Sequence, residues 1–145
     1  MVERPISLLV AVDFSPPSLK ALREGRRLAD RMGGSLTVLH VRPISDVRAA
    51  IAEGREDLLK GPPRALAAAM KSHYAMRLAR LVGRTGALDT GLASGRASRE
   101  ILRAAKGFDL VVMGRTGRGG ISGLLGGTTQ KILAACPVPV VVVPA

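Results

Sequence analysis

Cysteine is nearly absent from this sequence: Cys136 is the single one among 145 residues. One cysteine cannot close a disulfide within the chain, so a disulfide-stabilised fold is excluded. A chain of this length buries enough surface to fold without such a crosslink, and we expect one domain over residues 1–145. Cys136 precedes an apolar run and is expected to be a small core residue rather than a reactive thiol. This cysteine usage fits a reducing, cytoplasmic setting.

Long hydrophobic runs are also missing. The apolar run near the N-terminus is about six residues long and ends at Asp13, which makes it too short for a signal peptide. No stretch approaches the ~18 apolar residues that a membrane span requires. We therefore expect neither secretion by the classical route nor insertion into a membrane.

Aromatic and acidic residues are scarce. One Tyr, two Phe and no Trp provide almost no platform on which nucleic-acid bases could stack. The sequence has 11 acidic and 22 basic residues, which gives a formal net charge of +11. This charge favours anionic partners such as nucleotides, nucleic acid or acidic lipid. The arginines are spread along the chain at spacings typical of exposed helix faces. We therefore expect an arginine-rich solvated surface, and nucleic-acid binding is the less favoured interpretation.

Short apolar runs alternate with helical patterns along the whole chain. Strands are expected at residues 6–12, 35–41, within 86–95, at 109–114 and at 138–143. Helices are expected between Ser15 and Gly33, near 45–53, and at 64–82, 97–107 and 128–136. Near-continuous apolar strands that alternate with helices predict an α/β fold with a doubly wound, five-stranded, mostly parallel sheet and helices on both faces.

Several residues are expected to end these elements. Asp13 or Ser15 is predicted to cap the first long helix, and Ser94 or Ser98 the helix at 97–107. Pro137 and Pro139 fall within the last predicted strand and favour an edge position, because proline cannot donate to a sheet ladder. His73 has no partner at a metal-ligand spacing, so we expect an ordinary surface or half-buried histidine.

Glycine is concentrated in one place, the stretch MGRTGRGGISGLLGGTTQKIL at residues 113–133. Seven of its first fifteen residues are glycine, and it connects the end of a predicted strand to a helix that begins near Thr128. Glycines let backbone N–H groups approach an anion, and a helix N-terminus adds donors and partial positive charge. Thr128 and Thr129 are placed to cap that helix or to donate to phosphate oxygens. The stretch therefore predicts a phosphate-binding loop.

Two common phosphate loops do not match. Lys131 follows Gln130 rather than a glycine, so the pattern G-x-x-x-x-G-K-[ST] is missing, and G-x-G-x-x-G is missing as well. Without these parts, fast phosphoryl transfer is not expected.

The spacing that is present is Gly114, two residues, Gly117, nine residues, Gly127 and Thr128. It resembles the G-x2-G-x9-G-[ST] signature of the nucleotide-binding members of the universal stress protein family. The resemblance extends to residues 10–22, 39–43, 109–114 and 136–144, which look like the family's first strand and helix and three of its later strands. It implies a Rossmann-like fold of the adenine nucleotide alpha hydrolase type.

The family resemblance implies ATP and Mg²⁺ as ligands and a site made of specific residues. Asp13 looks like the acidic residue that faces the nucleoside and is the candidate for contact with Mg²⁺, although its carboxylate also suits an Asx turn or a cap. Val41 would contact the adenine edge through its backbone, and Met113 would pack beside the base or simply belong to the core. Ribose and phosphate contacts would come from Gly114, Gly117, Gly127, Thr128 and Thr129, with Arg115 and Arg118 as possible helpers.

One departure from the family pattern lies next to Asp13. Phe14 stands where relatives often have glycine, and its ring is expected to narrow the nucleoside pocket. This departure concerns affinity more than identity.

The resemblance also implies a homodimer in which the C-terminal strands meet, and a stress-response module that acts through protein partners. An alternative is a slow ATPase or a self-phosphorylating protein with Ser122, Thr128 or Thr129 as the acceptor. A further alternative is a stress protein that binds no nucleotide.

Overall fold

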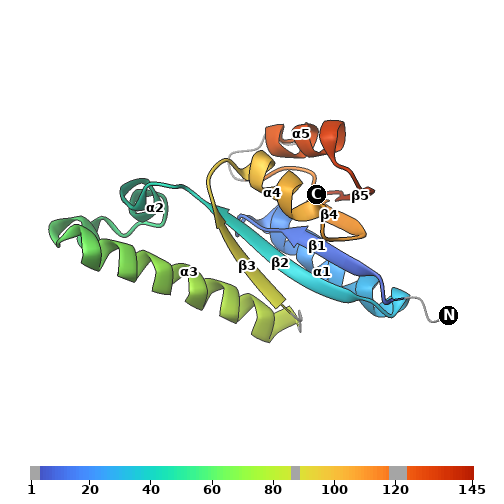
Figure 1. Ribbon diagram of the computed structural model, residues 1–145, viewed down its shortest axis with the longest axis horizontal. Coiled ribbons are helices and arrows are strands. Elements are labelled where there is room, and N and C mark those ends of the chain that lie inside the picture. The colour runs from blue at the N-terminus through green and yellow to red at the C-terminus, as the bar shows by residue number, and fades with distance from the viewer. Residues whose placement is uncertain (1–3, 86–88, 118–123) are drawn as a thin grey trace.

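The computed structural model describes residues 4–85, 89–117 and 124–145. Within these residues five strands form one sheet in the order β3-β2-β1-β4-β5 (Figure 1). They are β1 (Ser7–Ala11), β2 (Ser35–Arg42), β3 (Asp89–Ser94), β4 (Leu110–Gly114) and β5 (Val140–Val143). All four strand pairings are parallel, where the sequence predicted a mostly parallel sheet. The predicted fold class is confirmed.

The central strand β1 sets the position of the functional site. Val10 lies opposite Val38 of β2 and Val112 of β4, and all three side chains are buried. Strands β2 and β3 lie on one side of β1, and β4, which comes later in the chain, lies on the other side. The strand order therefore reverses between β1 and β4, and ligands of such sheets bind outside the carboxyl ends of the strands at this point.

Helices cover both faces of the sheet, as predicted. They are α1 (Pro16–Met32), α2 (Asp46–Ala52), α3 (Pro63–Thr85), α4 (Ala97–Ala105) and α5 (Gly127–Ala135), with a 3-10 helix at Glu56–Lys60. Side chains of α1 and α3 share one buried cluster with one face of the sheet, and α4 and α5 share another cluster with the opposite face. Figure 1 shows α3 and α5 on opposite sides of the sheet.

The ends of α1 follow the sequence closely. Ser15 is the N-cap, and its hydroxyl oxygen accepts from the backbone N–H of Ser18 at 3.4 Å. Gly33 ends the helix with φ at 63°, a left-handed conformation that costs glycine little. The predicted cap and stop of α1 are both confirmed.

The predicted caps of α4 and α5 are wrong. Arg96 is the N-cap residue of α4 and Gly126 that of α5, and neither helix has a side-chain cap among the described residues. Ser98 lies inside α4, and Ser94 is the last residue of β3. Neither helix therefore begins with a side-chain oxygen that accepts from a backbone N–H of its first turn.

The edge position of β5 is confirmed, although its prolines lie outside the strand. Pro139 immediately precedes β5, and its carbonyl accepts from Val111 of β4 at 3.0 Å. Because the strand begins after Pro139, neither proline interrupts the ladder. Among the described helices, none is both long enough and apolar enough to cross a membrane.

Candidate functional site

A cavity of about 270 Å³ opens at the carboxyl ends of β1, β2 and β4, where the strand order reverses. It lies close to the lower end of the roughly 300–1,000 Å³ typical of small-molecule pockets. All eight site residues predicted from the sequence line this cavity, and the list is Asp13, Val41, Met113, Gly114, Gly117, Gly127, Thr128 and Thr129. The structure thus brings together residues that are up to 116 positions apart in the chain.

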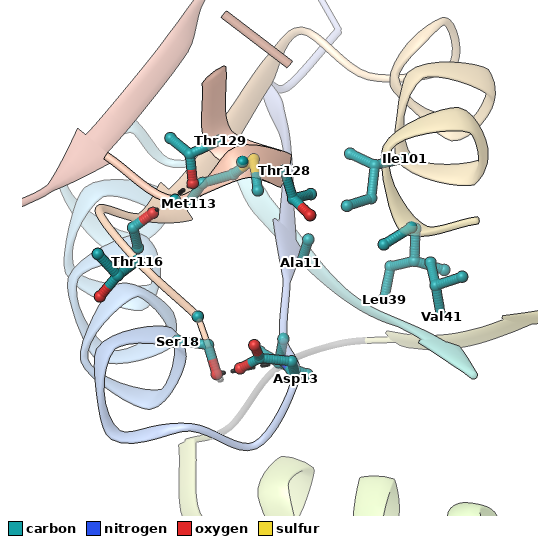
Figure 2. Close-up of a pocket in the computed structure, with 16 residues that line it drawn as sticks. Ala11, Asp13, Ser18, Leu39, Val41, Ile101, Met113, Thr116, Thr128 and Thr129 are labelled. Atoms are coloured by element: carbon teal, nitrogen blue, oxygen red, sulfur yellow. Dashed lines mark hydrogen bonds between the residues drawn. The ribbon is translucent and has the colours of Figure 1, made fainter. Parts of the chain in front are cut away.

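One wall of the cavity is apolar. Figure 2 shows Leu39 and Val41 from β2 next to Ile101 from α4. Ala97 of α4 lines the same wall. The contribution of α4 was not predicted from the sequence, because a helix with an apolar stripe has the same pattern whether that stripe contacts only the sheet or also a ligand. This wall has the chemistry that a flat heteroaromatic ring requires.

The opposite wall is polar and is built around Asp13, which follows the end of β1. The backbone N–H of Ser15 donates to Asp13 Oδ1 at 3.0 Å, and the Ser15 hydroxyl donates to the same oxygen. The backbone N–H of Asp13 itself donates to Ser18 Oγ at 3.2 Å (Figure 2). Asp13 therefore forms an Asx turn ahead of α1 while its carboxylate lines the cavity. The Asx turn predicted from the sequence is thus confirmed, and it leaves Asp13 in the lining of the cavity.

The glycines of the polar wall differ in what a side chain at each position would meet. A Cβ at Gly117 would lie 2.4 Å from Asp13 Oδ2, and one at Gly114 would lie 2.9 Å from the carbonyl oxygen of Pro17. A Cβ at Gly127 would meet no described atom within 4 Å. Packing within the protein therefore explains Gly114 and Gly117, whereas Gly127 leaves room beside the cavity at the start of α5.

Thr128 and Thr129 also differ in whether a contact within the protein uses the side chain. Thr129 is buried, and its Oγ1 donates to the carbonyl of Gly114 at 3.0 Å, which ties the first turn of α5 to the end of β4. Thr128 is half-buried and lines the cavity. The hydroxyl of Thr129 serves the fold, so Thr128 is the better placed of the two to donate to a ligand.

Three further residues were singled out from the sequence, and the structure describes one of them, Arg115. Arg115 is half-buried and does not line the cavity. Its backbone N–H donates to the carbonyl oxygen of Val143 at 3.1 Å. Arg118 and Ser122 fall outside the described residues. Among the described residues no group of three or more His, Cys, Asp or Glu side chains could hold a metal. A cation at Asp13 would need oxygen ligands from elsewhere.

The expected narrowing of the pocket by Phe14 is wrong. Phe14 has φ at 64°, an uncommon conformation for a bulky residue, and it does not line the cavity. Its ring lies 4.6 Å from the His40 ring, between centroids, and the Arg77 guanidinium lies 3.8 Å from its centroid. The left-handed backbone turns the side chain away from the cavity towards α3. Glycine would adopt this conformation without strain.

The residues on both sides of Asp13 are held by one cluster behind the site. Nδ1 of the buried His40 donates to the carbonyl of Val12 at 2.7 Å. Burial lowers the pKa of the His40 imidazole below its ordinary value, against the opposing effects of this hydrogen bond and of the Glu53 charge. Arg77 contacts Phe14 and also pairs with the buried carboxylate of Glu53. The cluster connects the loop that carries Asp13 to α2 and α3.

Comparisons with known proteins agree with this architecture. A model of the universal stress protein family matches residues 7–144. A protein of Thermus aquaticus described as "Universal stress protein in QAH/OAS sulfhydrylase 3'region" is 34% identical over 141 residues, which cover 94% of this chain and 97% of that protein.

Solved structures show the same likeness. Universal stress protein UspA from Lactobacillus plantarum is 26% identical, with 98% of this chain and 99% of that chain covered and a TM-score of 0.69. A universal stress protein described as a complex with cAMP is 20% identical, with 97% of this chain and 98% of that chain covered and a TM-score of 0.59. The second likeness shows the fold alone. With a family match over nearly its whole length, this chain belongs to the universal stress protein family.

Proposed function

We propose that residues 1–145 form one ATP-binding domain that acts as a nucleotide-dependent regulatory module in the stress response, through protein partners. The observation that carries the proposal is the cavity in which an apolar wall faces Asp13, the glycines and the start of α5. The cAMP complex of a relative with the same fold supports an adenine nucleotide as the ligand class. The free thiol of the half-buried Cys136 suits the cytoplasm as the place of action.

Different residues of the cavity would bind the base, the ribose and the phosphates of ATP. Leu39, Val41 and Ile101 would hold the base, and the Asp13 carboxylate would accept from ribose hydroxyls. Phosphates would lie near Gly127 and Thr128, where α5 begins without a side-chain cap and its N-terminal dipole favours an anion. Mg²⁺ commonly uses one or two protein carboxylates together with phosphate oxygens, so Asp13 alone suffices as its protein ligand.

Regulation is favoured over catalysis by the chemistry of the cavity. Asp13 is the one ionisable side chain among the described residues that line it. Its carboxylate already accepts two hydrogen bonds from Ser15, which weakens it as a general base. Slow ATP hydrolysis or self-phosphorylation at Thr128 remains the alternative, because that hydroxyl lines the cavity.

We expect nucleotide-free protein to bind ATP with Mg²⁺ at one site per chain in a calorimetric titration. Gly127→Ala is expected to weaken this binding about tenfold, because a Cβ would keep a charged phosphate from the backbone N–H groups, and one such hydrogen bond is worth roughly 1.5–3 kcal/mol. Gly83→Ala is the matched control, since a Cβ there also meets nothing within 4 Å and lies in α3.

No saturable heat up to millimolar ATP would refute nucleotide binding and place the chain among family members that bind none. Equal affinities of the Gly127→Ala and Gly83→Ala proteins would refute the placement of phosphates at the start of α5.

We also propose a homodimer through β5, which pairs with β4 alone among the described strands. The carbonyls of Pro139 and Val143 accept from Val111 of β4 and from Arg115 just after it, so Val140 and Val142 direct their backbone groups away from the sheet. An unpaired edge of valines invites pairing with another chain. Light scattering is expected to give a mass of about 30 kDa, twice the 15.1 kDa of the chain, and Val142→Pro should reduce it to that of a monomer. A wild-type mass near 15 kDa at micromolar concentration would contradict the dimer.

A further inference from the structure

A second hollow lies beside the candidate nucleotide cavity, at the carboxyl ends of β2 and β3. Its volume is about 460 Å³, and its lining includes Ile44, Arg48 and Arg96. Val41 lines both this hollow and the nucleotide cavity, so the two are contiguous. Nothing in the proposed nucleotide site uses the hollow or the helix α2 beside it.

The α2 segment presents a stripe of aliphatic side chains to solvent. Ile44 is 76% exposed, Val47 46% and Ile51 52%. Val47 and Ile51 lie four positions apart on one face of α2, and Ile44 lies just before the N-cap residue Ser45. On the opposite side of α2, Ala49 and Ala50 are already fully buried against α3. Three aliphatic side chains therefore stay exposed at and just before α2, and exposed apolar surface that gathers in one place marks interaction sites.

Positive charge lies beside this stripe. Arg48 and Arg96 both line the hollow, both are exposed, and no ion pair within the described ranges involves either guanidinium. The one carboxylate of α2, Asp46, pairs with Arg42 instead. The hollow thus offers two guanidinium groups to an incoming anion, in a chain whose net charge is +11.

We propose that Ile44, Val47, Arg48, Ile51 and Arg96 form a docking surface, the α2 surface, for an acidic segment of a partner protein that also carries aliphatic side chains. The aliphatic side chains of the partner would cover Ile44, Val47 and Ile51, and its carboxylates would pair with Arg48 and Arg96. A second copy of this chain fits poorly, because it would bring the same two arginines and a further charge of +11 to the contact.

The proposal is tested with peptides selected on the intact chain. Displayed random 12-residue peptides are selected in the absence of nucleotide, and the enriched peptides are synthesised and titrated by fluorescence anisotropy. We expect enrichment of Asp and Glu together with Leu, Ile or Val. The double variant Arg48→Glu, Ile51→Asp is expected to bind these peptides at least tenfold more weakly than the wild type.

A matched control distinguishes the α2 surface from general charge attraction. Met76 and Arg80 are both exposed on α3, and Met76→Asp with Arg80→Glu changes charge and apolar surface by the same amount. This control should bind the peptides as the wild type does. Arg96→Glu, on another element, gives an independent variant should the α2 double variant not fold.

Three results would overturn the proposal: no enriched peptide, enriched peptides without acidic residues, or equal loss of binding in the α2 and α3 variants. Because nucleotide is left out, a failure here is distinct from a failure of the proposed ATP site.

Discussion

Arg77→Ala is expected to lower the free energy of unfolding by about 3 kcal/mol, because the buried Glu53 carboxylate loses its arginine partner and breaking a buried ion pair is strongly destabilising. The Glu53 side chain is 5% exposed, and its Oε2 pairs with the Arg77 guanidinium. His73 Nε2 lies 3.1 Å from the same oxygen and remains as a weaker partner, which sets the effect at the lower end of the usual range. Chemical denaturation at neutral pH measures the change.

Two variants separate the buried charge from lost packing. Arg27→Ala removes an arginine from an exposed pair with Glu24 on α1, and such a pair is worth about 0–1 kcal/mol. Arg77→Met combined with Glu53→Met replaces both charges by apolar groups and should recover most of the stability. If Arg77→Ala costs no more than Arg27→Ala, the Glu53 carboxylate is satisfied without Arg77 and the expectation is wrong.

The Glu53 cluster shows why part of the molecule could not be predicted from sequence. Glu53 and Arg77 are separated by 24 positions, and neither stands in a motif. The sequence predicted His73 as an ordinary residue without a metal partner, and the structure places it as half-buried against Glu53. Such pairs depend on how α2 folds back on α3, which helical periodicity does not determine.

The sheet, by contrast, was predictable because its information is local. Each buried strand reads as an apolar run, as in Leu110–Gly114, and each connection as a helical pattern. Boundaries agreed within a few residues, while the caps failed at α4, where Ser94 ends β3 and Ser98 lies inside the helix, and at α5, where Thr129 has another partner. Thr129 donates to the carbonyl of Gly114, a contact that the sequence does not reveal.

The lining of the candidate site was predictable except for the part that α4 supplies, and Val41 and Met113 were predicted along with the polar residues. Glycine spacing identified the residues from Gly114 to Thr128, and Asp13 followed from its place after the first strand. The apolar wall that α4 supplies through Ala97 and Ile101 carries no comparable signal. Phe14 was misplaced for a backbone reason, since its positive φ turns the ring towards Arg77.

Gly117→Ala is expected to weaken ATP binding in the presence of Mg²⁺ by about 10- to 100-fold, because the Asp13 carboxylate must move. A Cβ at Gly117 would lie 2.4 Å from Asp13 Oδ2 and 3.4 Å from Asp13 Cγ. Rotation of the carboxylate separates it from the ligand or breaks its hydrogen bonds from Ser15, and hydrogen bonds to charged groups are worth about 1.5–3 kcal/mol each.

Gly117→Ala and Asp13→Asn are both expected to act through the Asp13 carboxylate. Each single variant should weaken binding of ATP with Mg²⁺, and the double variant should be hardly weaker than either, because residues in contact that share a partner are not additive. Calorimetric titration of the four proteins gives this cycle, and Gly83→Ala in α3 controls for the added methyl group. Gly117→Ala protein that binds ATP as tightly as the wild type would show that the Asp13 carboxylate does not face the nucleotide. Additive losses would instead assign Gly117 a contact of its own with the ligand, through its backbone N–H, and leave Asp13 as an independent part of the site.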